Sequence, residues 1–278
     1  MPVTYALMGI VNVTPDSFSD GEAFLDADAA VAHGRRLAAE GADILDVGGE
    51  STRPGAAPVA VAEELERVVP VVERLAGTVR LSIDTMKAEV AAAALDAGAD
   101  IVNDVTALRH SPEMAALIAD RDADCCLMHM RGDPQTMQDR PRYTDVVDDV
   151  RAFLEERLAH AVAAGIAERR VWLDPGIGFG KTVAHNLELL RRLDELAAIG
   201  RPLVIGTSRK GFLGRITGSP AADRLAGTIA TNVMALERGA TVFRVHDVAA
   251  VGEALQVAAA TVGPAGARDA GTAHEESR

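Results

Sequence analysis

The sequence predicts one α/β domain, a closed (β/α)8 or TIM barrel. Short apolar runs alternate with longer stretches rich in Ala, Leu, Glu and Arg that have a helical period. Strict β/α alternation is typical of a parallel sheet, and near-continuous apolar strands indicate that both of its faces are covered. Eight such units in about 260 of the 278 residues fit a closed barrel. A doubly wound open sheet is the structural alternative.

The elements follow one another in a regular order. Stretches of helical period include 62–77 and 149–165, and a last one at 247–263 follows the eighth strand. Gly-Ala-Asp leads from a helix into the next strand at 41–43 and at 98–100, and this recurring turn supports a repeated unit. The expected strands are 7–12, 43–47, 79–84, 100–105, 124–129, 170–174, 202–206 and 241–245.

Composition limits the class of protein. The formal net charge of −13 argues against broad nucleic-acid binding, although it allows a local basic pocket. Because the chain has neither a signal-peptide pattern nor an apolar run of about 18–20 residues, we expect a soluble cytoplasmic protein. The adjacent Cys125 and Cys126 are expected to be small apolar residues of a buried strand. We expect a barrel domain at 1–262 and a disordered tail at 263–278.

Polar side chains stand at the C-terminal end of every expected strand. In a barrel these ends meet at one rim, where active sites lie. One such residue is often a helix cap, but eight together indicate a pocket. The strand ends carry Asn12, Asp46, Asp84-Thr85, Asn103-Asp104, Met128-His129, Asp174-Pro175, Ser208-Arg209-Lys210, and Arg244 with His246-Asp247.

The polar groups at these strand ends are of two chemical kinds. Arginine, histidine and hydroxyl groups suit an oxyanion such as phosphate or pyrophosphate. Asp and Asn side chains suit a flat heterocycle with N–H donors along its edge, such as a guanine or pterin ring. Asn12 offers an oxygen that can hold Mg²⁺ beside pyrophosphate.

Three stretches between the elements add to the pocket. The loops 13–28 and 48–60 are longer than usual βα loops of about 2–6 residues, and their Phe18 and Arg53 favour contact with a second substrate. The stretch PGIGFGKT (175–182) resembles a P-loop, but Pro175 occupies the position of the first glycine. We interpret it as backbone that passes close to a flat ligand, with Phe179 available to stack.

Eight motifs run in order along the chain. They are MGIVNVTPDSFSDG (8–21), DVGGESTRPG (46–55), SIDT (82–85), NDV (103–105), LMH (127–129), DPGIGFGK (174–181), GTSRKGFLG (206–214) and FRVHDV (243–248). Over residues 5–262 the chain thereby resembles the dihydropteroate synthases, bacterial enzymes of folate synthesis. The resemblance implies a barrel, usually homodimeric, that joins 6-hydroxymethyl-7,8-dihydropterin pyrophosphate to p-aminobenzoate and releases pyrophosphate. It also implies a target of sulfonamides.

The resemblance further implies roles for single residues. The pterin would be held by Asp84, Asn103, Met128, Asp174, Phe179, Gly206 and Lys210. The pyrophosphate would be held by Asn12, Thr52, Arg53, Arg244 and His246, with Asn12 also binding Mg²⁺. The p-aminobenzoate would be framed by Phe18, Thr52, Arg53, Pro54, Ser208 and Lys210. The catalytic set would be Arg53, Asp84, Asp174, Lys210, Arg244 and His246.

The expected chemistry is a dissociative substitution at the pterin CH₂ group. Cations around the pyrophosphate would stabilise its departure, and Asp84 and Asp174 would stabilise positive charge on the dihydropterin. One alternative is the pterin-binding domain of a methyltetrahydrofolate methyltransferase, which has no use for TPDSFSD, STRPG or SRK. The other is a catalytically silent pterin-binding paralogue, which would lack pyrophosphate or p-aminobenzoate elements.

Overall fold

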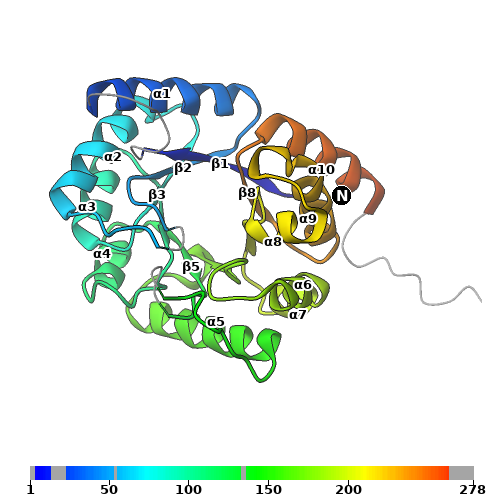
Figure 1. Cartoon of the computed structure of the whole chain (residues 1–278). Coiled ribbons are helices and arrows are strands. Elements are labelled where there is room, and N and C mark those ends of the chain that lie inside the picture. Colours follow the sequence, from blue (N-terminus) through cyan, green and yellow to red (C-terminus); the bar gives the residue numbers. More distant parts are fainter. Residues whose placement is uncertain (1–3, 14–22, 53–54, 133–135, 263–278) are drawn as a thin grey trace, which may run out of the picture.

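The chain folds into a nearly closed barrel of eight parallel strands surrounded by helices (Figure 1). The computed structural model describes residues 4–13, 23–52, 55–132 and 136–262, so the expected tail lies outside the described residues. Strands are paired in the order β6-β5-β4-β3-β2-β1-β8-β7. A parallel bridge between Leu173 and Leu203 brings the two end strands together. The predicted barrel is confirmed, and this order excludes the doubly wound alternative.

The strands agree closely with the sequence prediction. β7 is the shortest because Pro202, inside its predicted range, has no N–H to give to a ladder. The strands are β1 (Ala6–Asn12), β2 (Ile44–Gly48), β3 (Arg80–Asp84), β4 (Ile101–Asp104), β5 (Asp124–Met128), β6 (Val171–Asp174), β7 (Val204–Ile205) and β8 (Val242–Val245).

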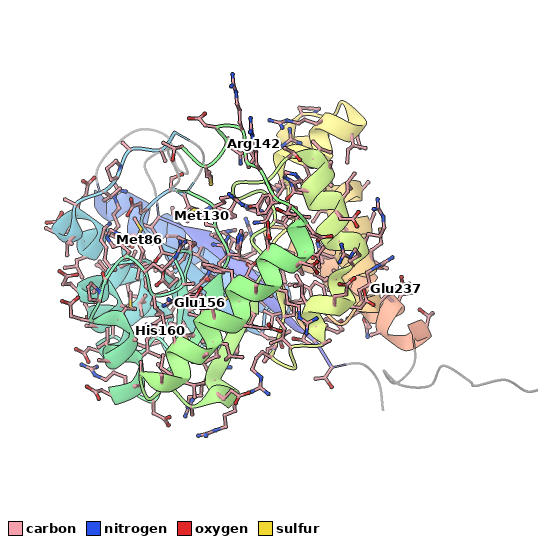
Figure 2. All side chains as sticks on the ribbon, turned by 90° about the horizontal axis from the view of Figure 1, so that it is seen from below. Met86, Met130, Arg142, Glu156, His160 and Glu237 are labelled. Atoms are coloured by element: carbon pink, nitrogen blue, oxygen red, sulfur yellow. The ribbon has the colours of Figure 1, made fainter. Side chains whose placement is uncertain are left out.

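The helices form the outer layer. The first begins at Ala23, so residues 23–28, which were expected in a loop, are helical. The helices are α1 (Ala23–Ala39), α2 (Val61–Leu75), α3 (Ala88–Asp96), α4 (Met114–Asp120), α5 (Val146–Ala163), α6 (Val183–Arg191), α7 (Leu193–Ala197), α8 (Gly211–Thr217), α9 (Leu225–Glu237) and α10 (Val248–Val262). In Figure 2, Met86, Met130 and Arg142 mark loops of the C-terminal rim, and Glu156 and His160 mark the outer helix α5.

The interior of the barrel is apolar at one end and polar at the other. Its apolar layer is a buried cluster of Met8, Ile44, Ile101, Cys126, Trp172, Val204 and Val242. Side chains two residues apart on a strand share a face. The next inward positions therefore carry Asp46, Asn103, Asp174 and Arg244. The apolar layer closes the bottom of the barrel, and the polar positions above it form the floor of the C-terminal rim.

The repeated Gly-Ala-Asp turn has a structural reason. Asp43 Oδ2 accepts a hydrogen bond from the Leu7 N–H, and Asp100 Oδ2 accepts one from the Leu81 N–H, both at 2.8 Å. The glycine before each aspartate has a φ of 100° or 109°, which only glycine adopts readily. Each turn thus fastens the start of one strand to the start of its neighbour.

Two further expectations concern the whole chain. Cys125 and Cys126 are buried and free in β5, as predicted, and burial raises the pKa of the Cys125 thiol to about 12. Within the described part of the chain, none of the helices combines the length and the apolar composition that crossing a bilayer requires.

Candidate active site

Arg244 joins four strands at the polar end of the barrel. Its Nε donates to Asp46 Oδ2 at 2.6 Å, and its Nη2 donates to Asp84 Oδ2 at 2.7 Å. Asn103 Nδ2 donates to the same Asp46 oxygen at 3.2 Å. The structure therefore brings together residues of β2, β3, β4 and β8, as expected for strand ends that meet at one rim.

Burial dominates the electrostatics of the carboxylates. It raises the pKa of Asp84 to about 7, although the Arg244 guanidinium opposes the shift. It also raises the pKa of Asp174, although the Gly176 N–H donates to Asp174 Oδ1 at 2.6 Å. Both groups would be stabilised as carboxylates by a ligand that brings N–H donors or positive charge.

An apolar wall with one amine stands beside these carboxylates. Lys210 Nζ lies 4.1 Å from the centre of the Phe179 ring, a cation–π contact. Burial and the nearby Arg244 lower the pKa of Lys210 to about 8. Met128 belongs to a buried cluster that packs against Phe179. A flat ring with polar edges fits a site of this composition.

His246 is held as a neutral imidazole. Burial, with Arg244 next in effect, lowers its pKa to about 4. Ser208 Oγ accepts from the His246 backbone N–H at 3.2 Å and lies 2.9 Å from His246 Nδ1. This pattern favours donation by the serine hydroxyl to Nδ1, which leaves the proton on Nε2 for a ligand oxygen.

The stretch PGIGFGK folds against the end of β5. Gly176 has a φ of 65°, and a Cβ there would lie 2.0 Å from the His129 carbonyl oxygen. Gly180 has a φ of 63°, and a Cβ there would lie 2.6 Å from the Arg131 carbonyl oxygen. The sequence suggests that this backbone passes close to a ligand. In the structure, Gly176 and Gly180 are required by close contact with neighbouring backbone instead.

Lys181 ties this stretch together from inside. It is 2% exposed, and its Nζ donates to the carbonyls of Gly176 and Phe179, each at 3.0 Å. It also lies 2.9 Å from His129 Nδ1. Burial lowers the pKa of Lys181 to about 7 and, together with the lysine, that of His129 to about 2, so His129 is a neutral acceptor. Lys181 thereby supports the backbone that presents Phe179.

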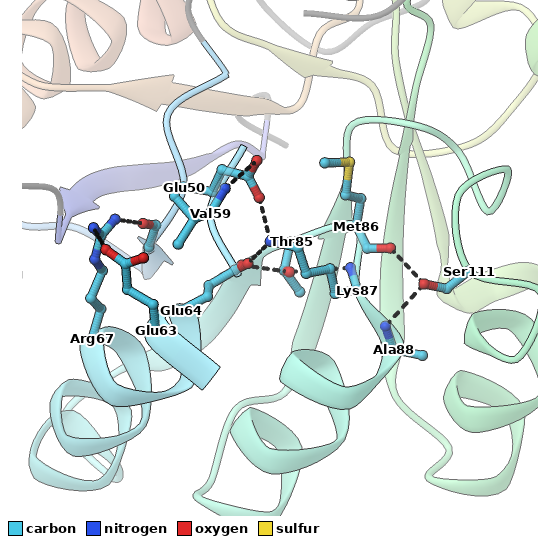
Figure 3. Close-up of polar contacts among 11 residues, drawn as sticks. Glu50, Val59, Glu63, Glu64, Arg67, Thr85, Met86, Lys87, Ala88 and Ser111 are labelled. Atoms are coloured by element: carbon cyan, nitrogen blue, oxygen red, sulfur yellow. Dashed lines mark hydrogen bonds and ion pairs between the residues drawn. The ribbon is translucent and has the colours of Figure 1, made fainter. Parts of the chain in front are cut away.

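A second buried lysine lies where the segment after β2 begins (Figure 3). Lys87 Nζ donates to Glu50 Oε2 at 2.5 Å and pairs with Glu64 on α2. Thr85 Oγ1 donates to Glu64 Oε1 at 2.7 Å. These contacts fasten Glu50, which lies in the motif DVGGESTRPG, to the residues that follow Asp84.

The remaining predicted residues lie around the same rim. Asn12 ends β1 in register with Gly48, and Thr52 is partly buried after β2. Gly206 follows β7, where a Cβ would lie 4.0 Å from Arg244 Cβ. The other predicted residues, Phe18, Arg53 and Pro54, lie outside the described residues.

Comparison with known proteins agrees with this geometry. A family model described as "Pterin binding enzyme" matches residues 8–246. The dihydropteroate synthase of Neisseria meningitidis serogroup C is 49% identical over 255 residues, covering 90% of each chain. The same enzyme of Escherichia coli strain K12 is 46% identical over 258 residues, covering 92% of this chain and 91% of the relative. This chain belongs to the dihydropteroate synthase family.

Solved structures of the family share the fold. A Xanthomonas albilineans dihydropteroate synthase with 4-aminobenzoic acid has 52% identity and a TM-score of 0.86, covering 91% of this chain and 92% of the other. The Xanthomonas albilineans enzyme in complex with 7,8-dihydropteroate has 49% identity and a TM-score of 0.83, with the same coverage. A Yersinia pestis dihydropteroate synthase with a sulfonamide drug complex has 46% identity and a TM-score of 0.88, covering 93% and 94%.

Several residues of this rim have contacts that their place in the sequence does not predict. Asp46 was noted only as a strand end, yet it is fully buried and accepts from both Arg244 and Asn103. Lys181 and Lys87 were also missed. The composition of the sequence could have pointed to them, because only three of the 28 Lys and Arg residues are lysines.

Proposed function

We propose that this member of the family condenses 6-hydroxymethyl-7,8-dihydropterin pyrophosphate with p-aminobenzoate to give 7,8-dihydropteroate and pyrophosphate. The observation that carries the proposal is the rim where Arg244 bridges Asp46 and Asp84 and where Asn103 donates to the same Asp46. Asp174 ends β6 at the same rim. Carboxylates for the pterin edge and a guanidinium for the leaving group thus lie within one contact network.

The pterin would lie between the carboxylates and the wall of Phe179 and Met128. Asp84, Asn103 and Asp174 would accept or donate at its polar edge. Lys210 and Gly206 would border the ring from the β7 side.

The pyrophosphate would lie toward Arg244 and His246, where the guanidinium and the Nε2–H stabilise developing negative charge. Asn12 and Thr52 would complete this side, together with Arg53. Within the described residues, no group of three or more His, Cys, Asp or Glu side chains could hold a metal ion. The Asn12 amide oxygen nonetheless fits Mg²⁺, because this ion takes most of its oxygens from substrate phosphates and water. Bound Mg²⁺ would neutralise charge on the leaving pyrophosphate.

The reaction proposed is a dissociative substitution at the pterin CH₂ group. The amine of p-aminobenzoate is a weak nucleophile, so departure of pyrophosphate governs the barrier. Asp84 and Asp174, as carboxylates, stabilise the cationic dihydropterin that forms. Phe18, Pro54 and Ser208, with Thr52, Arg53 and Lys210, would place the amine, and sulfonamides would compete for the same position.

We also propose a cytoplasmic homodimer. Met234 on α9 and Val257 on α10 are 42% and 63% exposed, although both are large and apolar. Helices α9 and α10 pack side by side in the outer layer of the barrel (Figure 1), and each of them exposes one of these side chains. A second copy of the chain is the expected partner of this surface.

The test is product formation by the purified protein. Dihydropterin pyrophosphate, labelled p-aminobenzoate and Mg²⁺ are expected to give labelled dihydropteroate, and EDTA and the Arg53→Ala variant are expected to abolish it. Tight binding of dihydropterin pyrophosphate without turnover would instead indicate the silent paralogue. If the protein neither binds dihydropterin pyrophosphate nor forms product, the proposed site is contradicted.

A further inference from the structure

Lysine is rare in this chain, and all its lysines lie at the C-terminal rim of the barrel. Of the 28 basic Lys and Arg residues, 25 are arginine, and the three lysines are Lys87, Lys181 and Lys210. All three lie in segments that follow strands at the C-terminal rim, and two of them are buried. An ammonium group is a compact charge with three donors, whereas a guanidinium is a wide planar fork. Lysine is therefore suited to gathering acceptors at a crowded point.

Lys87 gathers acceptors from two other parts of the chain (Figure 3). It is 8% exposed and precedes α3, while Glu50 follows β2 and the fully buried Glu64 belongs to α2. Burial alone would lower the pKa of Lys87, but the hydrogen bonds to Glu50 and Glu64 outweigh it and raise the pKa. The lysine is therefore charged and pairs with both carboxylates.

Glu50 connects the two ends of the segment 51–58. Its Oε2 accepts from Lys87 Nζ at 2.5 Å, and its Oε1 accepts from the Val59 N–H at 3.4 Å. Just before it, the Gly49 carbonyl accepts from Arg67 Nη1 at 2.7 Å. Both stems of the segment are thus fastened to the barrel at Lys87 and Arg67.

Lys87 is also connected to Thr85, the residue that follows Asp84. The Lys87 N–H donates to Thr85 Oγ1 at 3.2 Å, and Thr85 Oγ1 donates to Glu64. Thr85, Lys87, Glu64 and Glu50 are therefore parts of one largely buried polar network, which also includes the Val59 N–H. Replacing such a network by apolar side chains is often neutral or stabilising, so stability alone does not require it.

We propose that Lys87 is a positioning residue that fixes where the segment bearing Thr52 leaves the rim, relative to Asp84. It thereby sets the distance between two sides of the site. One side would hold p-aminobenzoate and the leaving group, and the other would hold the pterin. This inference rests on the proposed function, in which Thr52 and Asp84 serve the two sides.

The test is the Lys87→Met variant, which keeps the length of the side chain and removes the charge. We expect kcat/KM for p-aminobenzoate to fall about tenfold or more, because small displacements of positioning groups have effects of this size. The affinity for 6-hydroxymethylpterin without pyrophosphate is expected to stay within about threefold, since Asp84 keeps its bond to Arg244. Arg74 lies on α2, as Glu64 does, and forms an exposed ion pair with Asp28 on α1. Arg74→Met, which breaks this pair, is the matched control and is expected to change neither quantity.

A second variant separates positioning from stability. Lys87→Met leaves Glu64 buried without its cation, so the melting temperature is expected to fall. Lys87→Met/Glu64→Gln removes that unpaired charge, and its melting temperature is expected to recover while kcat/KM stays low. Recovery of kcat/KM together with the melting temperature would overturn the proposal.

Amide hydrogen exchange gives a readout that does not depend on activity. In Lys87→Met, the amides of 49–52 and 59 are expected to exchange faster, while those of β4 and β5 keep their protection. Unchanged protection at 49–52 and 59 would overturn the positioning role. Absence of turnover in the wild-type protein would instead count against the proposed function, and the exchange result would still decide the role of Lys87.

Discussion

At the scale of single residues, the main feature of the site is that one guanidinium serves two buried carboxylates. Arg244 bonds Asp46 through Nε and Asp84 through Nη2, and each contact is short and charge-assisted. When a pterin takes the Asp84 carboxylate, the Asp46 contact can still hold the arginine in place. In the proposed reaction, Asp46 would thus keep Arg244 directed toward the leaving group.

The planar fork of Arg244 predicts that lysine cannot replace it. We expect Arg244→Lys to lower kcat/KM by about 100-fold, as for loss of one positioned donor to an oxyanion. Steady-state kinetics with both substrates measure this loss. Arg121→Lys, in an exposed pair with Asp96, should remain at the wild-type value. Activity in Arg244→Lys equal to that of this control would show that the guanidinium geometry is not used.

The raised pKa of Asp84 predicts a pH dependence. In the proposed reaction its carboxylate form would stabilise a dihydropterin cation. The value of kcat/KM for dihydropterin pyrophosphate, which reports the free enzyme, should therefore rise with pH through about 7. The stability effect has the opposite sign, because a folded pKa above the unfolded value of 3.8 means that this group's contribution weakens as pH rises from about 4 to 7. The Asp84→Asn variant should lose the rise in kcat/KM. A rise of equal size in this variant would assign the titration to another group.

At the scale of elements, the loop after β6 shows why the motif PGIGFGK contains its glycines. Its glycines look like a phosphate-binding sequence, yet Gly176 and Gly180 are needed because the backbone that follows β5, at His129 and Arg131, lies against them. Lys181 then fastens the same loop through its carbonyls. These contacts hold the backbone that presents Phe179.

Gly176→Ala tests this explanation. Both the positive φ and a Cβ 2.0 Å from the His129 oxygen oppose the substitution, so we expect a loss of stability above about 2 kcal/mol. Gly200→Ala is the matched control, because Gly200 has a φ of 82° but no neighbour within 4 Å of a Cβ, and about 1 kcal/mol is expected there. Urea unfolding of the two variants measures the difference. Equal losses would mean that φ alone explains Gly176.

At the scale of the whole molecule, the closed barrel collects residues that are far apart in sequence. The strands could be predicted from the pattern of apolar residues along the sequence. Most rim residues could be predicted because they stand at the C-terminal ends of those strands. The pairing of Asp46 with Arg244 and the networks of Lys87 and Lys181 could not, since they depend on which strands and helices become neighbours. The early start of α1 was missed because residues 23–28 lie next to a loop-like sequence.

The outer surface of α9 and α10 gives a prediction about assembly. Introducing a buried charge into a self-complementary apolar interface is costly, so we expect Val257→Asp to shift the protein from dimer to monomer. Light scattering after gel filtration measures the mass. Val162→Asp on α5, where the side chain is 41% exposed, is the control and should leave the dimer intact. A monomeric wild-type protein would contradict the proposed homodimer.

In the proposed reaction the cations of the rim stabilise the leaving pyrophosphate, and positional isotope exchange tests this role most directly. The substrate carries ¹⁸O in the bridge between its CH₂ group and the first phosphorus, and it is incubated with the protein and Mg²⁺ without p-aminobenzoate. Reversible departure of pyrophosphate predicts that the label moves into non-bridging positions of that phosphate. A label that stays in the bridge, in protein that binds the substrate and turns it over with p-aminobenzoate, would contradict departure before attack.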